Sequence, residues 1–384
     1  MARRLVVLYH DDFREHSPGS VRHPEDPGRL DIALKSVADV ISYAPGRRVA
    51  VRVAPRGDLN VFNKVHDQAY VERVKAILRS RKFEWLDKDT YVSRGTIKAL
   101  SRLAGASQKA VILALRGVNS FILGRPPSHH AGRSGRAMRA PSMGFCLLNA
   151  TALIAGVLAA HGRVAVVDFD VHHGNGTQEI FYSNPHILHV DIHVDPAVSY
   201  PGTGYPGDVG EGEGAGTKVN IVTPHMAGDD IYGDVLELVE AILSSWKPDY
   251  IVVSAGFDAY RGDNEMVLMN VGTRFYYNIG RLLAFNARAV VSVLEGGYSI
   301  GLDRAFKAYI AGILGLRTWP WDPPSHSGNT AWRTYKAYKR LVVASILKHG
   351  RISLPKEIAR EAEALKPKVR RYRRRKRRYR RYIF

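Results

Sequence analysis

Along roughly the first 300 residues, short runs of β-branched and aliphatic residues alternate with longer amphipathic stretches, and no other feature of the sequence limits the fold as strongly. Such alternation is typical of a mainly parallel sheet whose faces are covered by helices. We therefore predict an α/β fold. The runs that we interpret as buried strands are residues 5–8, 120–123, 164–167, 187–190, 251–253 and 289–293.

The segments between these runs show helical periodicity. The clearest predicted helices are residues 95–116, 147–160 and 232–246. Ligands of parallel α/β sheets bind at the carboxyl ends of the strands. The unusual polar clusters of this sequence follow the predicted strands, which indicates an active site at that edge of the sheet.

A chain of 384 residues can hold one large α/β domain or two ordinary ones. We predict one catalytic domain over residues 1–365, with its core motifs in 1–320, followed by a basic tail, 366–384. Three other segments stand out by composition. They are a Gly-rich surface loop at 202–216, a Pro- and Trp-rich closing segment at 319–327, and C-terminal helices over about 331–365.

Several classes of protein are excluded by composition. No apolar run reaches the length of a membrane span. The basic N-terminus leads into an apolar run that is too short for a signal peptide, so we expect a first buried strand there. The single cysteine, Cys146, excludes an intramolecular disulfide and fits a reducing compartment. It also excludes a cysteine-based zinc site, and we interpret Cys146 as a small core residue.

The strongest local signal is D-F-D-V-H-H-G-N-G-T at 168–177, directly after a predicted strand. Asp170 and His172 are two residues apart, so on an extended backbone both side chains point the same way and can bind one divalent ion. Alone, the pattern also fits a polar strand end with a helix cap. Asp258, after the strand at 251–253, would be a third ligand and leave a position open for water, as in catalytic zinc sites. The oxygen-rich set also suits iron(II) or manganese.

Two weaker motifs also follow predicted strands. R-P-P-S-H-H-A at 125–131 contains His129 and His130, and an imidazole can act as a general base near neutral pH. The alternatives are a metal-ligand or core role, or an incidental surface pair. L-E-G-G-Y at 294–298 leaves Tyr298 at a strand end, where a phenol can donate to a developing oxyanion. An ordinary Gly-Gly turn with a buried tyrosine is the alternative.

In this order, the four motifs resemble the histone deacetylase family of the arginase/deacetylase superfamily. The closest resemblance is to its class II-like branch, which also holds acetylpolyamine amidohydrolases and acetoin-utilisation proteins. It implies a single domain with a sheet of about eight strands flanked by helices. Further matching segments are H-P-E-D-P-G-R-L (23–30), V-H-D-Q-A-Y (65–70), D-T-Y-V-S (89–93), G-F-C-L-L-N (144–149) and Y-P-G-T-G (200–204).

The resemblance implies a zinc-dependent amidohydrolase that removes acetyl groups from acetylated lysine side chains or from acetylated polyamines. Zinc would be bound by Asp170, His172 and Asp258. His129 and His130 would be the acid–base pair, with His130 the general base. Asp168 and Asn175 would be the partners of the two histidines, and Tyr298 would be the oxyanion donor. The implied substrate-binding residues are Phe145, Tyr200, Gly144 and Asp89. The resemblance also implies that Asp168 and Asp191 bind a monovalent cation such as K⁺, and that Arg29 lies on a path for acetate.

Three positions depart from the family pattern. Ser128 stands where class II relatives usually have glycine, and Asn175 stands where class I relatives have aspartate. Residues 259–266, A-Y-R-G-D-N-E-M, replace the usual segment after the third ligand, which puts the local loop and the substrate choice in doubt. Two alternatives come from other functional classes. One is a non-catalytic, nucleic-acid-associated protein on this fold, and the other is an arginase-like binuclear manganese hydrolase.

The tail holds twelve Lys or Arg residues and no acid, so of the formal net charge of +20 only +8 belongs to the rest of the chain. We expect residues 366–384 to be disordered when free. A dense basic segment binds phosphate backbones, and Tyr372 and Tyr379 could stack on bases. We predict a nucleic-acid or ribonucleoprotein partner, with an anionic membrane surface as the alternative. A cytoplasmic location, with association to the nucleoid, is expected.

Overall fold

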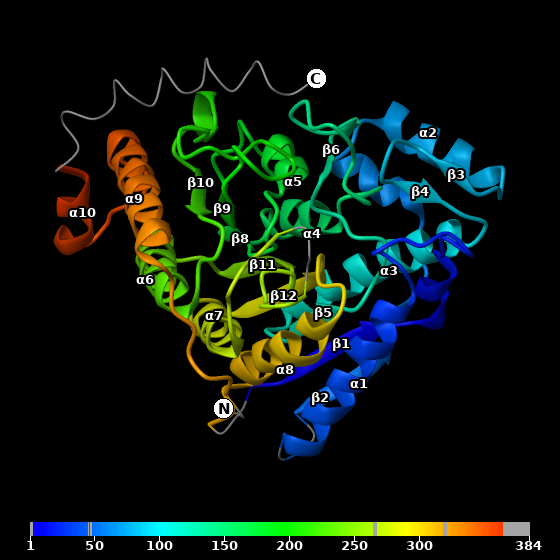
Figure 1. Cartoon of the computed structure of the whole chain (residues 1–384). Helices are drawn as coiled ribbons and strands as arrows, with labels where there is room; N and C mark the ends of the chain where they lie inside the picture. Colours follow the sequence, from blue (N-terminus) through cyan, green and yellow to red (C-terminus); the bar gives the residue numbers. More distant parts are fainter. Residues whose placement is uncertain (1–2, 45, 47, 264–266, 318–320, 364–384) are drawn as a thin grey trace.

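Parallel strands run through the middle of the molecule (Figure 1). The computed structural model describes residues 3–363 except 45, 47, 264–266 and 318–320. Within this part of the chain, one eight-stranded sheet has the order β10-β9-β8-β11-β12-β5-β1-β2, and every neighbouring pair is parallel. This confirms the predicted α/β fold. The strands are β1 (Leu5–Tyr9), β2 (Val49–Val53), β5 (Asn119–Ile122), β8 (Val164–Asp168), β9 (Ile187–Val194), β10 (Lys218–Thr223), β11 (Tyr250–Ala255) and β12 (Ala289–Leu294).

The two strands that the sequence analysis missed, β2 and β10, are the two edges of this sheet. Three of the five residues of β2 are exposed, so the strand does not read as a buried run. β10 is buried throughout but contains Lys218 and Asn220. The Lys218 ammonium is satisfied inside the protein, because Nζ donates to the Ile187 carbonyl oxygen at 2.8 Å and to Thr217 Oγ1 at 2.7 Å. A search for apolar runs passes over both strands.

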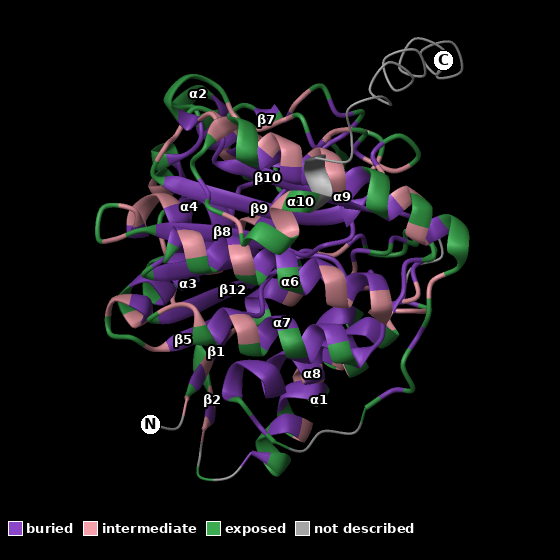
Figure 2. Cartoon of the chain, turned by 90° about the vertical axis from the view of Figure 1, so that its left-hand side faces the viewer, coloured by how far each residue is buried: buried purple, intermediate pink, exposed green. Residues whose placement is uncertain are grey.

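Helices cover both faces of the sheet (Figure 1, Figure 2). On one face lie α1 (Gly28–Tyr43), α6 (Asp229–Trp246), α7 (Thr273–Phe285) and α8 (Ile300–Leu314); α3 (Thr96–Leu115) and α4 (Ala150–Leu158) cover the other. The predicted helices at 95–116, 147–160 and 232–246 thus match α3, α4 and α6. Apart from the edge strand β2, the strands between the two layers are mostly buried, which places the core there.

Smaller elements complete the described part of the chain. The C-terminal helices predicted over about 331–365 are α9 (Asn329–His349) and α10 (Lys356–Glu363) within the described residues, and Gly350 ends the first in a left-handed conformation (φ 66°). The Gly-rich segment at 202–216 is a loop apart from one short 3-10 turn. The remaining elements are α2 (Gln68–Arg79), α5 (Asn175–Ile180), η1 (Asp11–Glu15), η2 (Leu59–Lys64), η3 (Gly212–Gly214), the β3 (Glu84–Trp85) and β4 (Tyr91–Val92) pair, and the β6 (Ala131–Gly132) and β7 (Gly135–Arg136) pair.

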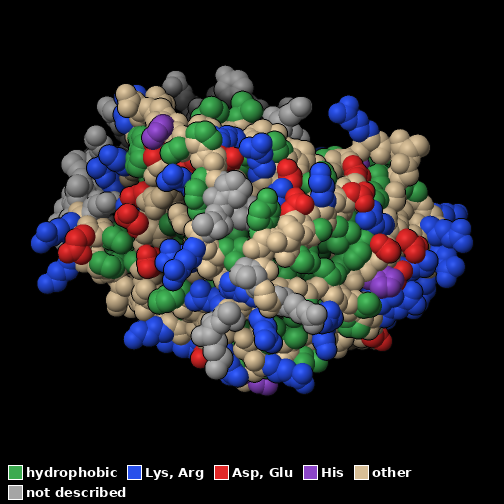
Figure 3. Space-filling model, turned by 90° about the horizontal axis from the view of Figure 1, so that it is seen from below, with side chains coloured by type: hydrophobic (Ala, Val, Ile, Leu, Met, Phe, Trp, Pro, Cys, Tyr) green, Lys and Arg blue, Asp and Glu red, His purple; other side chains and the backbone are tan. Residues whose placement is uncertain are grey.

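The surface carries charge of both signs. On the face seen in Figure 3, Lys and Arg side chains are spread among acidic, apolar and uncharged ones rather than gathered in one place. Of the described helices, none is both long and apolar enough to cross a membrane. The tail at 366–384 and Trp319 of the closing segment lie outside the described residues, so the expectations about them stay predictions.

The strand order creates a switch point between β8 and β11. After β8 the chain moves outward through β9 to β10 and then returns to β11 on the other side of β8. Ligands of open parallel sheets bind where the order reverses in this way. The four sequence motifs follow β5, β8, β11 and β12, which are adjacent in the sheet. Parallel strands present their carboxyl ends at one edge, so the fold brings all four motifs together.

Candidate metal centre and active site

Three potential metal ligands meet at the switch point. Asp170 and His172 follow β8, and Asp258 follows β11. One ligand atom of each lies within 4.8 Å of the other two. Nδ1 of His172 is 3.2 Å from Asp170 Oδ1 and 3.3 Å from Asp258 Oδ2. The structure therefore brings the predicted ligand set together.

The donor atoms of this group fit a divalent cation. Asp258 Oδ2 is buried and has no hydrogen-bond partner within the described residues, whereas Asp258 Oδ1 accepts from the Val171 N–H at 3.0 Å. Burial by itself lowers the pKa of His172, but the adjacent carboxylates of Asp170 and Asp258 outweigh this effect and raise the pKa to about 9. The two carboxylates thus attract positive charge. One imidazole and two carboxylates leave a tetrahedral ion one open position.

The tandem histidines lie beside this group, with their ring centroids 4.0 Å apart. His129 Nδ1 is 2.9 Å from Asp168 Oδ2, and His130 Nδ1 is 2.7 Å from Asn175 Oδ1. Because an amide oxygen only accepts, His130 carries its hydrogen on Nδ1 and leaves Nε2 free to take a proton. The predicted partners, Asp168 and Asn175, are the observed ones.

The two histidines differ in electrostatics. Burial lowers the pKa of both rings. For His129, the charges of Asp168 and Asp170 outweigh burial and raise its pKa well above the usual value. For His130, the neighbouring His129 adds to burial, and the pKa falls well below the usual value. The pKa values of the two neighbouring rings are therefore shifted in opposite directions.

Tyr298 follows β12 and is held through its backbone. Its N–H donates to Asp263 Oδ2 at 2.8 Å, and Asp263 Oδ1 accepts from the N–H groups of Ser299 and Gly301 at 2.8 and 2.7 Å. Asp263 was given no role in the sequence analysis, although it lies in the segment that departs from the family pattern. Asp263 is far from α8 in the sequence and approaches it only in the folded chain. No local capping motif could therefore have revealed this contact.

A pocket of about 410 Å³ connects the surface to these groups. Phe145 faces Tyr298 edge-on, with ring centroids 6.2 Å apart, and Tyr200 packs edge-on against His130 at 4.9 Å. The residues lining it include every predicted substrate-binding residue, two of the three ligands, both histidines and Tyr298: Arg22, His23, Pro24, Trp85, Lys88, Asp89, Pro127, His129, His130, Gly144, Phe145, Asp170, His172, Tyr200, Gly296 and Tyr298.

Gly144 leaves room for the two sides of this pocket to approach each other. Its φ is +53°, which is in the left-handed region. A Cβ at this position would lie 2.5 Å from His130 Cδ2 and 2.6 Å from Tyr200 Oη, closer than real contacts allow. The backbone at 144 therefore requires glycine for both its conformation and its surroundings.

A buried carboxylate, Glu295, fixes the backbone below the histidines. Glu295 Oε2 accepts from the N–H groups of Ser128 and His129 at 2.6 and 3.2 Å, and Oε1 accepts from Ser128 Oγ at 2.5 Å. The serine that departs from the class II pattern thus gains a partner in the structure. Cys146 is buried as expected, and burial raises the pKa of its thiol well above the usual value.

A second group of potential ligands lies one strand further along the sheet. Asp168 and Asp191 are register partners on β8 and β9, and His189 completes a set whose ligand atoms all lie within 4.8 Å of one another. Both ring nitrogens of His189 are buried without a hydrogen-bond partner in the described part of the chain. The sequence analysis missed His189. Its signal was the H-x-D-x-H alternation on β9, which puts His189, Asp191 and His193 on one face.

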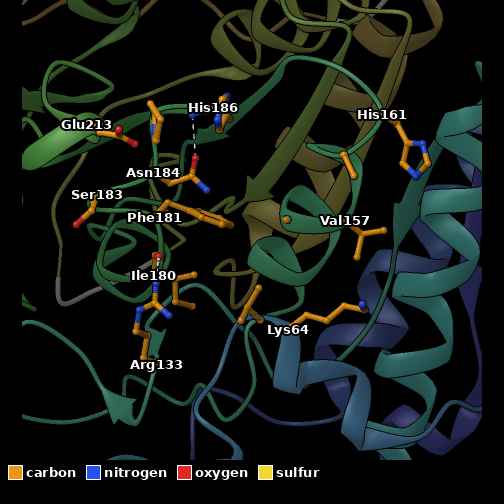
Figure 4. A pocket seen from close by; sticks show the side chains of 14 residues that line it. Lys64, Arg133, Val157, His161, Ile180, Phe181, Ser183, Asn184, His186 and Glu213 are labelled. Carbon is orange, nitrogen blue, oxygen red and sulfur yellow. Dashed lines mark hydrogen bonds between the residues drawn. The ribbon is translucent and has the colours of Figure 1, made fainter.

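A hollow larger than the active-site pocket lies elsewhere on the described surface (Figure 4). It measures about 770 Å³ and lies between the end of α4 and the segment after α5. Lys64, Arg133 and His161 lie around it, well separated from one another. No ligand cluster or predicted catalytic residue lines this hollow among the described residues, so its size does not make it the active site.

Comparisons with known proteins show to which family this chain belongs. Residues 23–313 match the histone deacetylase domain. The chain belongs to the histone deacetylase family. A relative named acetylpolyamine amidohydrolase, from Burkholderia pseudomallei, is 38% identical and matches over 82% of this chain and 100% of its own length. A relative named probable deacetylase, from Archaeoglobus fulgidus, is 33% identical over 77% of this chain and 81% of its own length.

The fold of this family is also seen in a solved structure. The HDA15 HD domain superimposes with a TM-score of 0.77 at 29% sequence identity, over 91% of this chain and 98% of the domain. An uncharacterised protein of Methanocaldococcus jannaschii is 38% identical over 80% of this chain and 87% of its own length. The predicted histone deacetylase resemblance and the single α/β domain are therefore confirmed.

Proposed function

We propose that this chain is a zinc-dependent deacetylase that hydrolyses the amide bond of acetylated amines. The observation that carries the proposal is the convergence of a three-ligand group, a tandem histidine pair and Tyr298 on one pocket. Family membership and relatives named deacetylase and amidohydrolase support the same class of hydrolase. A complete set of these groups disfavours a non-catalytic role.

Asp170, His172 and Asp258 would hold the ion. When bound, it would act as a Lewis acid that polarises the acyl carbonyl and makes water acidic enough to attack near neutral pH. The narrow walls formed by Phe145 and Tyr200 would orient the acyl-amine stem and exclude bulk water.

His130 is the proposed general base. Its pKa is lowered, so the ring is neutral at pH 7, and Nε2 is free because Asn175 holds Nδ1. It would take a proton as water attacks and leave His129, whose pKa the carboxylates of Asp168 and Asp170 raise, to stabilise the developing negative charge. A protonated histidine then returns the proton to the leaving amine, so that the amine departs neutral.

Tyr298 is the proposed oxyanion donor. Its hydroxyl stays protonated, since burial and the nearby Asp258 raise its pKa well above the usual value. A phenol that is held by Asp263 through its backbone would donate to the former carbonyl oxygen without first reorganising.

The experiment that tests the proposal measures release of acetate from acetyl-lysine peptides and from N-acetylputrescine by zinc-, iron(II)- and manganese-loaded protein. Turnover of either class with zinc supports it. Failure of every acetylated amine with each metal would overturn it.

Gly144→Ala should lower turnover by about tenfold or more, because His130 and Tyr200 must move and small displacements of catalytic groups are costly. The measurement is kcat with an acetyl-lysine peptide, together with the melting temperature. Gly207→Ala is the matched control, since a Cβ there meets nothing within 4 Å. Parent-like turnover of Gly144→Ala would contradict the assigned pocket geometry.

We also propose a monovalent cation such as K⁺ at Asp168 and Asp191, whose carboxylates are buried next to His129. An ion there would hold Asp168 in place and so affect the His129 charge. Dependence of turnover on K⁺, lost in Asp191→Ala, would support the assignment.

The basic tail is proposed to bind nucleic acid. Deleting residues 366–384 should leave turnover of a small acetyl-lysine substrate within about twofold, because no active-site residue lies there. The dependence of DNA affinity on salt should flatten sharply, since up to twelve phosphate contacts vanish and each contributes roughly 0.9 to the slope. Fluorescence anisotropy over a salt series measures this. An unchanged slope would contradict nucleic-acid binding by the tail, and loss of liposome binding instead would favour the membrane.

A further inference from the structure

The mouth of the active-site pocket is positively charged. Arg22 and Lys88 line the outer part of the pocket and are both exposed. Neither side chain forms an ion pair or a hydrogen bond with another described residue. They approach from two separate segments, one before α1 and the other in the β3–β4 hairpin. A substrate that enters the pocket therefore meets two exposed cations that form no ion pair with a described residue.

The acidic groups of the mouth are turned inward. Asp89 is the one carboxylate that lines the described outer pocket, and its two oxygens accept from Thr90 Oγ1 at 2.9 Å and from Ser142 Oγ. Asp87 Oδ2 accepts from the Met143 N–H at 2.7 Å, and Oδ1 accepts from the N–H groups of Asp89 and Thr90. These carboxylates hold the hairpin against the pocket wall. Asp89 lines the pocket and Asp87 does not, so the two cations, Arg22 and Lys88, outnumber the one carboxylate in the lining of the mouth.

The remaining acid of the hairpin, Glu84, points away from the mouth. Glu84 and Trp85 are successive residues of β3, so their side chains lie on opposite faces of the hairpin. Trp85 lines the pocket and is 43% exposed, and Phe83 beside it is 42% exposed. The rim thus offers flat apolar surface next to cations. This surface suits the backbone and side chains of a peptide.

We infer that the pocket selects peptide-borne acetyl-lysine with acidic neighbours and disfavours acetylated polyamines. The inference rests on the proposed deacetylase function and specifies its substrate. In an acetylated polyamine, the next ammonium follows the acyl-amine stem by a few methylenes and would reach Arg22 and Lys88. Like charges repel there, whereas a carboxylate on a flanking residue of a peptide is attracted. Asp89 is left to accept from a substrate backbone N–H.

The test compares two acetyl-lysine peptides that differ only in Asp or Lys on both sides of the acetyl-lysine, together with N-acetylputrescine. At low ionic strength, kcat/KM should favour the acidic peptide by about five- to tenfold over the basic one, as expected for two exposed charges. The ratio should shrink toward one in 0.5 M salt because exposed charges are screened. N-acetylputrescine should be the poorest of the three substrates.

The double variant R22E/K88E should reverse the peptide preference. The matched control is Lys109→Glu, an exposed position on α3 that does not line the pocket, which should leave the preference unchanged. An unchanged preference in R22E/K88E, or equal use of the three substrates by the parent, would overturn the inference.

A binding measurement separates this inference from the proposed function. Fluorescence anisotropy with the labelled peptides and a Tyr298→Phe background reports affinity without turnover. Charge-dependent binding that R22E/K88E reverses, in a parent that hydrolyses nothing, would contradict the proposed function and leave the mouth assignment standing. Hydrolysis of all three substrates with equal kcat/KM would support the proposed function and contradict the inference about the mouth.

Discussion

Asp258→Ala is expected to lose the divalent ion and all measurable deacetylase activity together. Asp258 Oδ2 is the buried ligand atom without another partner, so nothing else in the described site replaces it. Two of three protein ligands hold an ion poorly, and the missing Lewis acid removes several kcal/mol of transition-state stabilisation. At about 1.4 kcal/mol per tenfold, the loss in kcat should be at least about a thousandfold. Asp170→Ala and His172→Ala should behave in the same way.

The measurement is metal content per chain by mass spectrometry, alongside acetate release. Asp31→Ala is the matched control, since Asp31 forms an exposed pair with Arg14 at 2.7 Å, and such pairs contribute little. Circular dichroism of each variant checks that the fold is retained. A folded Asp258→Ala protein with full zinc and full turnover would show that the ligand set is wrong.

Tyr298→Phe and His130→Ala are expected to keep the metal and lose on the order of a hundredfold or more in kcat. The first variant removes a donor that acts in the transition state, and the second removes the neutral base. Neither residue belongs to the ligand set, so zinc content should stay at the parent level. KM should change less than kcat, because these interactions form mainly in the transition state.

Tyr277→Phe provides the control for loss of a hydroxyl. The Tyr277 hydroxyl donates to the Leu316 carbonyl oxygen at 2.6 Å, away from the pocket, so this variant should melt at a lower temperature but keep its turnover. If Tyr298→Phe or His130→Ala turned over substrate within a few-fold of the parent, that residue would lose its assigned role.

The two strand ends at 168–177 and 254–258 illustrate what could be predicted. Their ligand residues follow apolar runs, and parallel strands bring their carboxyl ends to one edge. The metal group, the tandem histidines and Tyr298 could therefore be placed in one site without coordinates. β2 and β10 could not be predicted in this way, because one is largely exposed and the other contains a buried lysine.

The sequence by itself determined that strands and helices alternate, and it determined which side chains follow each strand. Both properties depend only on residues that are close together along the chain. The tertiary structure alone decided which distant groups support them. Asp263 accepts from the Tyr298 backbone, and Glu295 accepts from Ser128 and His129. Such contacts join segments that are far apart in the chain. The packing of helices and loops on the sheet sets which residues meet, so no local periodicity or spacing in the sequence predicts these contacts.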